Sequence, residues 1–239
     1  MQRYFSLSKE QIEISINDIH HILHVMRGRI GDFFEIVFNE KIYTMEITSL
    51  NPFEYQIRDI NSFNNELTNK ITLIYALSKG DKNEFVIQKA TELGVSKIVL
   101  VSSRRSVVKM SQDDFDKKKI RYHKIIKEAS EQSKRNVLPE IVGLYSLDKL
   151  PKEVMSNINL VAYEEDSGST KGTFAILDNV KNDESISIVI GSEGGIDKEE
   201  LSYLNNNGFK NISLGKRILR TESAAVYALS VISFMLERK

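Results

Sequence analysis

The segment from residue 186 to residue 200 constrains the fold more than any other part of the chain. It begins with Ile-Ser-Ile-Val-Ile at 186–190 and continues with Gly-Ser-Glu-Gly-Gly at 191–195. A strand that is apolar on both faces is typical of a parallel sheet covered by helices. Asp197 and Glu200 have the spacing of a capping box, which predicts that a helix begins after the loop. The segment therefore predicts an α/β fold with a ligand-binding loop beyond the carboxyl end of a strand.

Strands and helices are expected to alternate through the whole of residues 69–239. The predicted strands are 71–77, 97–101, 160–163, 186–190 and 211–214. The predicted helices are 81–93, 113–135, 197–206 and 221–236. Asp81 and Glu84 have the spacing of a second capping box, at the start of the first of these helices. Such alternation favours an α/β domain with a largely parallel sheet.

Residues 1–68 follow a different pattern, with short strands and no long helix. The predicted strands are 33–38, 42–47 and 55–60, with a hairpin turn at 39–41 and a short helix at 18–26. This spacing favours a small β-barrel or sandwich. Residues 61–70 are polar and rich in asparagine, which is typical of a linker. We therefore expect one domain over 1–68 and a second over 69–239.

Composition excludes several classes of protein. The 33 basic and 33 acidic residues balance, so any nucleic-acid binding has to come from local basic patches. The chain has no cysteine, which excludes disulfides, thiolate metal sites and a cysteine nucleophile. His20, His21 and His24 have no acidic ligand in fitting register, so no metal site is predicted. No apolar run approaches the ~18 residues of a membrane span. The first residues lack the layout of a secretory signal, so we expect a cytoplasmic protein with no membrane partner.

The loop at 191–195 has two interpretations. Its three glycines allow close backbone approach to a ligand, but a tight strand-to-helix turn explains them equally well. The spacing does not match the dinucleotide-binding or phosphate-loop motifs. Glu193 would also repel a polyphosphate. A ligand with a cationic centre, such as S-adenosylmethionine, fits better.

A second loop, residues 214–220, precedes the last predicted helix. Thr221 has the residue type of an N-cap, and Glu222 suits the positive first turn, so both could be purely structural. Arg220 adds positive charge where the helix dipole is already positive, which makes it a candidate for contacting an anion. The helix that follows is apolar on nearly all sides. It is therefore expected to be buried, either inside one subunit or in a dimer contact.

Several separate motifs now point to one family. They are Phe-Val-Ile-Gln-Lys-Ala-Thr-Glu-Leu-Gly-Val at 85–95, Glu-Ala-Ser-Glu-Gln-Ser-Lys-Arg at 128–135, Ile-Gly-Ser-Glu-Gly-Gly at 190–195 and Leu-Gly-Lys-Arg-Ile-Leu-Arg-Thr-Glu at 214–222. Arg-Tyr-Phe at 3–5 and His-Ile-Leu-His-Val-Met-Arg at 21–27 precede them. In order and spacing, the chain resembles the bacterial 16S ribosomal RNA uracil-N3 methyltransferases of the RsmE family over essentially its whole length.

The resemblance implies a PUA-like RNA-binding β-barrel followed by a SPOUT-type α/β domain with a trefoil knot, working as a homodimer. It also implies that three loops, after the predicted strands 160–163, 186–190 and 211–214, hold S-adenosylmethionine. The donor-binding residues carried over are Ala162, Tyr163, Glu164, Ile190, Gly191, Glu193, Gly194, Gly195, Leu214, Gly215, Ile218, Leu219, Arg220 and Thr221. The chain departs from the family at Ser192, where proline is usual, and at Ser223, where threonine is usual. Serine lacks the fixed φ of proline, which favours a looser loop at Ser192.

The implied reaction is methylation of N3 of one uridine in 16S rRNA, with the rRNA or the 30S ribosomal subunit as partner. Arg220 could stabilise the uracil anion, and Glu222 could accept the N3 proton or hold Arg220 in place. The expected RNA contacts are Arg3, His24, Arg27, Arg29, Arg104, Arg105 and Arg135. Two alternatives stay open: a non-catalytic RNA-binding protein with the same two domains, and a SPOUT enzyme that modifies a tRNA ribose or base.

Overall fold

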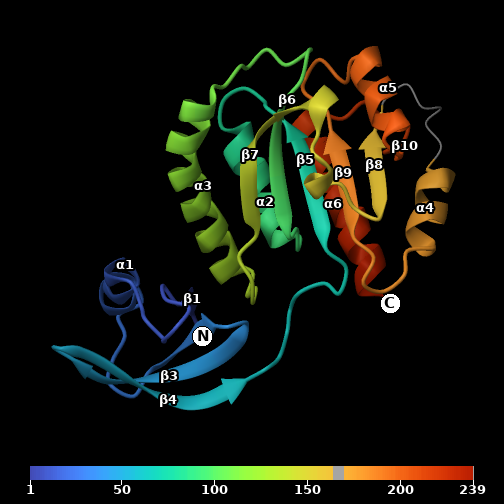
Figure 1. Cartoon of the computed structure of the whole chain (residues 1–239). Helices are drawn as coiled ribbons and strands as arrows, with labels where there is room; N and C mark the ends of the chain where they lie inside the picture. The colour runs from blue at the N-terminus through green and yellow to red at the C-terminus, as the bar shows by residue number, and fades with distance from the viewer. Residues whose placement is uncertain (164–169, 239) are drawn as a thin grey trace. The chain divides into compact units, whose positions relative to one another are not determined.

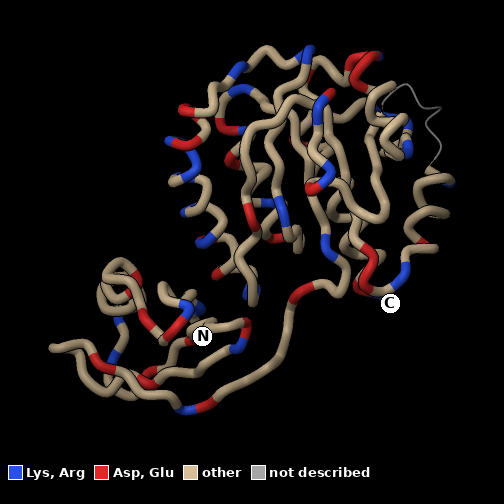
Figure 2. Tube along the Cα trace, viewed as in Figure 1, with Lys and Arg blue, Asp and Glu red and all other residues tan. Residues whose placement is uncertain are grey.

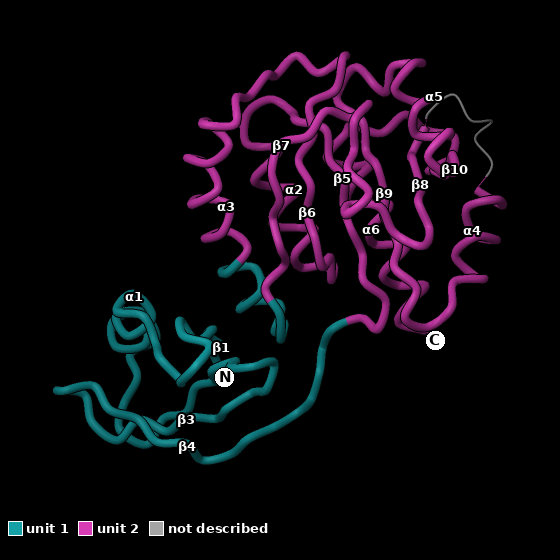
Figure 3. The backbone as a smooth tube through the Cα atoms, in the orientation of Figure 1, with its two compact units in different colours: residues 1–66, 127–137 teal, residues 67–126, 138–239 magenta. Residues whose placement is uncertain are grey.

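The computed structural model describes residues 1–163 and 170–238, which form two compact units (Figures 1 and 3). Unit 1 comprises Met1–Glu66 and Lys127–Val137, and unit 2 comprises Leu67–Ile126 and Leu138–Lys239. The last turn of the long helix α3 (Gln112–Gln132) and the residues that follow it therefore belong with unit 1. The predicted division into 1–68 and 69–239 stays a prediction.

Unit 1 contains a four-stranded sheet in the order β1-β2-β3-β4. Its strands are β1 (Arg3–Phe5), β2 (Phe33–Phe38), β3 (Lys41–Leu50) and β4 (Phe53–Asn61), and only the β1–β2 pair is parallel. Asn39 and Glu40, both with positive φ, form the predicted hairpin turn. The predicted short helix is α1 (Ile16–His20), which continues into the π-helical turn η1 (His21–Val25). Tyr4, Ile22, Phe34, Ile36, Met45 and Ile47 form the core of this unit.

Unit 2 is built on a six-stranded sheet, parallel throughout, in the order β10-β8-β9-β5-β6-β7. Its strands are β5 (Ile71–Ala76), β6 (Lys97–Ser102), β7 (Glu140–Ser146), β8 (Ile158–Ala162), β9 (Ile186–Ile190) and β10 (Phe209–Ile212). Its other helices are α2 (Lys82–Glu92), α4 (Lys171–Asp178), α5 (Lys198–Asn206) and α6 (Thr221–Glu237), with short 3-10 turns η2 (Leu147–Lys149) and η3 (Lys152–Val154). The predicted α/β class with a parallel sheet is confirmed.

Alternate residues of the central strands feed two separate apolar clusters, one on each face of the sheet. In β5, Leu73 and Tyr75 join a cluster that includes residues of α2, α3 and α6, whereas Ile74 joins one that includes residues of α5, η2 and η3. All residues of β5 and β9 are buried, as the apolar pattern at 186–190 predicted. These covered faces leave the ends of the strands as the place for a ligand. Strand order does not define a knot, so the trefoil knot stays a prediction.

Of the two capping boxes predicted from the sequence, one is present in the structure and one is not. The capping box at Asp197 and Glu200 is confirmed, and α5 begins there. The one at Asp81 is wrong: the Asp81 side chain makes no capping hydrogen bond, and Glu84 accepts hydrogen bonds from Arg121 instead. β7 and α4 were not predicted. β10 ends two residues earlier than expected, because residues 213 and 214 already belong to the loop that lines the pocket described next.

Candidate active site

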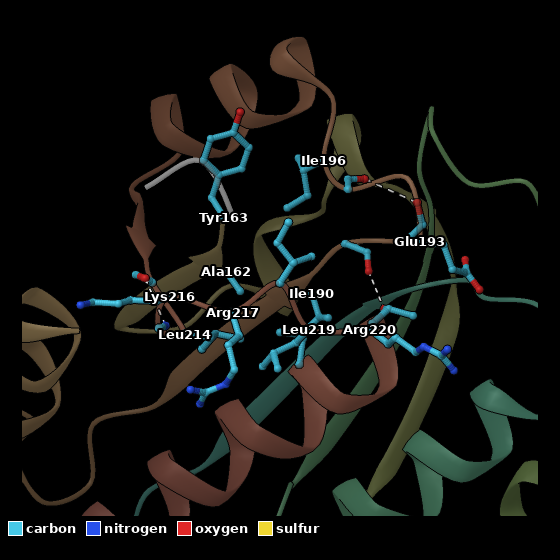
Figure 4. A pocket seen from close by; sticks show the side chains of 18 of the residues that line it. Ala162, Tyr163, Ile190, Glu193, Ile196, Leu214, Lys216, Arg217, Leu219 and Arg220 are labelled. Carbon is cyan, nitrogen blue, oxygen red and sulfur yellow. Dashed lines mark hydrogen bonds between the residues drawn. The ribbon is translucent and has the colours of Figure 1, made fainter. Parts of the chain in front are cut away.

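A pocket of about 410 Å³ lies where the chain leaves β8, β9 and β10. Figure 4 shows side chains from all three places around it, among them Tyr163, Ile190 and Leu214. Its lining residues are Lys82, Ala162, Tyr163, Ile190, Gly191, Ser192, Glu193, Gly195, Ile196, Ser213, Leu214, Gly215, Lys216, Arg217, Ile218, Leu219, Arg220, Thr221 and Ala224. β8 lies between β9 and β10 in the sheet, so the two glycine-bearing loops follow strands that are not adjacent.

Most of the residues predicted to bind the donor line this pocket. Two predicted residues, Glu164 and Gly194, are not among the lining residues. Glu164 lies outside the described residues, and Gly194 packs elsewhere: a Cβ on Gly194 would lie 2.9 Å from both the Cβ and the carbonyl oxygen of Arg105. Gly194 is therefore needed for the close contact between its loop and the loop after β6.

The loop at 191–195 is both a tight turn and a wall of the pocket. The Gly195 N–H donates to the Ser192 carbonyl oxygen at 2.9 Å, and Gly195 has a φ of 74°. A Cβ on Gly191 would lie 2.8 Å from Ile196. Ser192, in the place of the usual proline, is buried and its hydroxyl lies 3.4 Å from that of Ser103. The two interpretations of the loop are therefore compatible.

Thr221 joins the two loops. Its hydroxyl donates to the Gly191 carbonyl oxygen at 2.6 Å, across 30 positions of the sequence. The N-cap of α6 is Arg220, so the predicted capping role of Thr221 is wrong. The reason is that the Thr221 hydroxyl bonds to the neighbouring loop instead of to its own helix. Gly215, with a φ of 109°, allows the second loop to turn toward the pocket.

Arg220 is exposed at the pocket (Figure 4). In residues 1–163 and 170–238, no acidic side chain lies within ion-pair distance of its guanidinium group. A guanidinium offers five N–H donors. Arg220 is therefore free to bind an anionic group, as its position before a helix suggested.

Two carboxylates meet a single lysine at the pocket's edge. Lys82 Nζ lies 3.0 Å from Glu193 Oε1 and 3.4 Å from Glu222 Oε2. The hydrogen bond to Glu193 raises the pKa of Lys82. Burial would raise the pKa of Glu193, but hydrogen bonds from Lys82 and from the Lys79 backbone N–H outweigh it and lower the pKa. Glu222 therefore has Lys82 as its ion-pair partner, and in the part of the chain that the structure describes no ion pair joins Glu222 to Arg220.

The comparisons with known proteins agree with this geometry. Residues 65–233 match the family described as an RNA methyltransferase domain, and residues 17–59 match one described as an RNA methyltransferase PUA domain. The ribosomal RNA small subunit methyltransferase E of Bacillus subtilis is 38% identical, over 99% of this chain and 98% of the relative. That of Mesomycoplasma hyopneumoniae is 32% identical, over 96% of this chain and 98% of its own. The chain belongs to the RsmE family.

Solved structures resemble this RsmE-family chain over nearly its full length. A Legionella pneumophila methyltransferase, in complex with the cofactor SAM, has a TM-score of 0.85 at 30% identity and covers 98% of this chain and 97% of its own. A Neisseria gonorrhoeae ribosomal RNA small subunit methyltransferase E, bound to S-adenosyl methionine, has a TM-score of 0.81 at 29% identity, with 98% of each chain covered.

Two of the arginines expected to contact RNA are buried. Arg3 pairs with Glu35 at 2.8 Å and donates to the Lys134 carbonyl oxygen, and its side chain is 5% exposed. Arg135 donates to Glu66 and is 4% exposed. Both guanidinium groups bond to other groups of unit 1, so this structure leaves them little surface for a contact with RNA. Their role in RNA binding stays a prediction.

The other expected RNA contacts are accessible. His24, Arg27 and Arg29 are exposed around η1 of unit 1. Arg104 and Arg105, after β6 in unit 2, are about half exposed and lie beside Asp197, to which Asp148 and Glu199 add further negative charge. Figure 2 shows this mixing of basic and acidic residues along much of the chain. The positive charge of Arg104 and Arg105 is therefore largely offset. In the described residues, by contrast, no acidic side chain lies within ion-pair distance of His24, Arg27 or Arg29.

Several residues of the pocket were not predicted: Lys82, Ser192, Ile196, Ser213, Lys216, Arg217 and Ala224. Most adjoin predicted residues in sequence. Lys82 does not, and only the parallel pairing of β5 with β9 brings the start of α2 to the pocket. Within the described ranges, no group of three His, Cys, Asp or Glu side chains could hold a metal ion. Nor does any described helix have the length and hydropathy to cross a bilayer.

Proposed function

We propose that this protein is an S-adenosylmethionine-dependent methyltransferase that modifies N3 of one uridine in 16S rRNA, in the small ribosomal subunit. One observation carries the proposal: the loops at 191–195 and 214–220 line the same pocket. Arg220, which has no acidic partner in the described residues, lines it too. The two related structures that contain S-adenosylmethionine support the choice of donor. The relatives' names support ribosomal RNA of the small subunit as substrate. The protein would then act in the cytoplasm.

The pocket suits such a donor. Its volume is within the range of small-molecule sites, about 300 to 1,000 Å³. Ile190, Ile196 and Leu219 provide apolar walls, and backbone groups of the two loops supply polar contacts. Glu193 adds one negative charge, which complements a cationic ligand. When bound, the donor supplies a methyl group on a positively charged sulfur, which keeps the electron pair of the broken bond.

The protein's own residues then have to manage the uracil. N3 carries a proton that has to leave before its electron pair can form the new N–C bond. Arg220 stabilises the negative charge that develops on the uracil oxygens. Glu222, in the first turn of α6, accepts the N3 proton. The base has to be unstacked to reach the pocket, so a flipped or single-stranded uridine is expected.

RNA binding is proposed for the exposed group around η1, His24, Arg27 and Arg29, with Arg104 and Arg105 as weaker contributors. The η1 group also presents Val25, Met26 and Ile30 to solvent. Cations beside apolar side chains can contact both phosphates and unstacked bases.

We also propose a homodimer. α6 buries one side inside unit 2, but Phe234 and Tyr227 on the same helix stay 74% and 42% exposed. Phe174 of α4 is also exposed. Exposed aromatic residues of this kind are enriched at protein interfaces. Light scattering should give the mass of two chains for the wild type and one chain for Phe234→Asp. A monomeric wild type would contradict the dimer.

The function is tested by incubating the protein with labelled donor and either 16S rRNA or 30S subunits from a strain that lacks this methylation. The label is then mapped by nuclease digestion and mass spectrometry. We expect it on N3 of one uridine. Transfer to tRNA alone would refute the substrate. Calorimetry without any donor binding would instead favour a non-catalytic RNA-binding protein.

A further inference from the structure

We propose that Lys82 is a positioning residue for methyl transfer, which holds the Glu222 carboxylate in place to accept the N3 proton. This inference rests on the proposed methyltransferase function. Lys82 lines the pocket from α2, an element that carries no other residue of the site. Its ammonium group is the only described cation within ion-pair distance of Glu222.

Among the described carboxylates at the pocket, Glu222 is the one still available as a base. Glu193 Oε1 already accepts hydrogen bonds from Lys82 at 3.0 Å and from the Lys79 backbone N–H at 3.2 Å. Glu222 Oε2 is buried and accepts no hydrogen bond from the described residues; Lys82 Nζ, its ion-pair partner, lies 3.4 Å away. Thr221 and Ala224, on either side of Glu222, line the pocket. Glu222 does not itself line the pocket, but it lies at the pocket's edge beside Lys82, and its Oε2 has free hydrogen-bonding capacity.

The titratable groups around Glu222 come from four elements, although only Lys82 lies within ion-pair distance of it in the described residues. Lys82 lies on α2, Glu193 on the loop after β9, and Arg220 at the start of α6. Tyr75, at the end of β5, is buried, and this burial raises the pKa of its hydroxyl, so it is neutral. Glu193 carries the same charge as Glu222, and Lys82 Nζ lies within ion-pair distance of both carboxylates. Without Lys82 the two carboxylates would face each other with no cation between them.

Lys82 is not needed to hold α2 in place. Asn83, the next residue, is buried and bonds to Ser78 twice: its amide nitrogen donates to the Ser78 carbonyl oxygen at 2.8 Å, and its amide oxygen accepts from the Ser78 N–H at 3.1 Å. The Lys82 side chain is 31% exposed, and ion pairs of this kind contribute little to stability. Replacement of Lys82 should therefore leave the fold and the start of α2 intact.

The proton balance follows from these contacts. The N3–H bond of uridine breaks, the proton goes to a carboxylate oxygen of Glu222, and the N3 electron pair forms the bond to the methyl group. The electron pair of the old sulfur–carbon bond stays on sulfur. Lys82 keeps its proton throughout, because its hydrogen bond to Glu193 raises its pKa. Lys82 thus acts on the base and does not itself exchange the proton.

The test is the pH profile of single-turnover methyl transfer to 16S rRNA by the full-length protein. In Lys82→Met, the acid limb should move to higher pH by about one unit, so that the rate on this limb falls about tenfold. The rate on the alkaline plateau should change little. Lys82→Arg keeps the charge and should restore the wild-type profile. Lys89→Met is the matched control, because Lys89 is an ion-paired lysine of the same helix, bonded to Glu92 and outside the pocket.

A second measurement separates a positioning role from damage to the site. If Lys82 acts through Glu222, Lys82→Met should have no further effect on the profile in a Glu222→Gln background. Donor affinity, measured by calorimetry, should stay within a few-fold in every variant. A Lys82→Met profile that is unchanged, or lowered equally at every pH, would overturn the inference while leaving the function intact. A wild type that transfers no methyl group would instead refute the function, and this inference with it.

Discussion

Three motif arginines, two in unit 1 and one in unit 2, have opposite surroundings. In unit 1, Arg3 and Arg135 are buried and paired with Glu35 and Glu66. In unit 2, Arg220 is exposed at a pocket and has no acidic partner in the described residues. A charge whose partner is built into the fold contributes to structure, whereas a charge without one is available to a ligand. Burial and pairing, rather than residue type, therefore separate the scaffold from the site.

The largest effect that this comparison predicts is on catalysis. Arg220→Ala should lower the rate of methyl transfer by about 10² to 10³-fold, because one donor to a developing anion is removed. Donor affinity should stay within a few-fold, and the free energy of unfolding should hardly change. Single-turnover rates, calorimetry and urea unfolding measure the three quantities. Equal losses in rate and donor affinity would make Arg220 a donor-binding residue and not a catalytic one.

The buried arginines should behave in the reverse way. Arg135→Met leaves the Glu66 carboxylate buried without its partner, which should lower the free energy of unfolding by about 3 kcal/mol. Donor affinity should be unaffected, since Arg135 does not line the pocket. Arg104→Met, which removes a half-exposed arginine paired with Asp148, is the control and should cost far less. A stable Arg135→Met protein that binds RNA poorly would restore Arg135 to the RNA-binding surface.

A smaller effect is expected for Thr221, whose side chain belongs both to the scaffold and to the site. Thr221 is buried and bonded to Gly191, and it also lines the pocket. Thr221→Val should cost about 1 kcal/mol of stability and weaken donor binding several-fold, because Gly191 loses its anchor. Thr91→Val removes a buried hydroxyl that donates to the Ile87 carbonyl oxygen within α2 and should affect stability alone. If both variants bound the donor equally well, the link between the loops would have no functional role.

The same distinction explains which features could be predicted from the sequence. The buried strand β9 and the capping box of Asp197 depend on residues close in sequence, and both predictions are correct. The capping box of Asp81 failed because Glu84 bonds to Arg121, 37 positions away. The burial of Arg3 could not be predicted for the same reason, since its partner Glu35 lies on another strand. Pairing between distant residues is fixed by the fold, and no local pattern reveals it.

The smallest predicted effect concerns the Glu193–Lys82 ion pair, which is neither buried like the pairs of unit 1 nor fully exposed. The Glu193–Lys82 pair is partly exposed, and the lowered pKa of Glu193 links it to pH. Because the folded-state pKa lies below the unfolded value, the stabilisation is present above about pH 4.5 and is lost as pH falls through the folded value. Glu193→Gln should therefore be slightly less stable than the wild type in urea at pH 7, and the difference should vanish once the pH falls below the folded-state pKa of Glu193. A difference that persists at low pH would mean that Glu193 stabilises the loop through packing and hydrogen bonds, like the buried pairs of unit 1, and not through its charge.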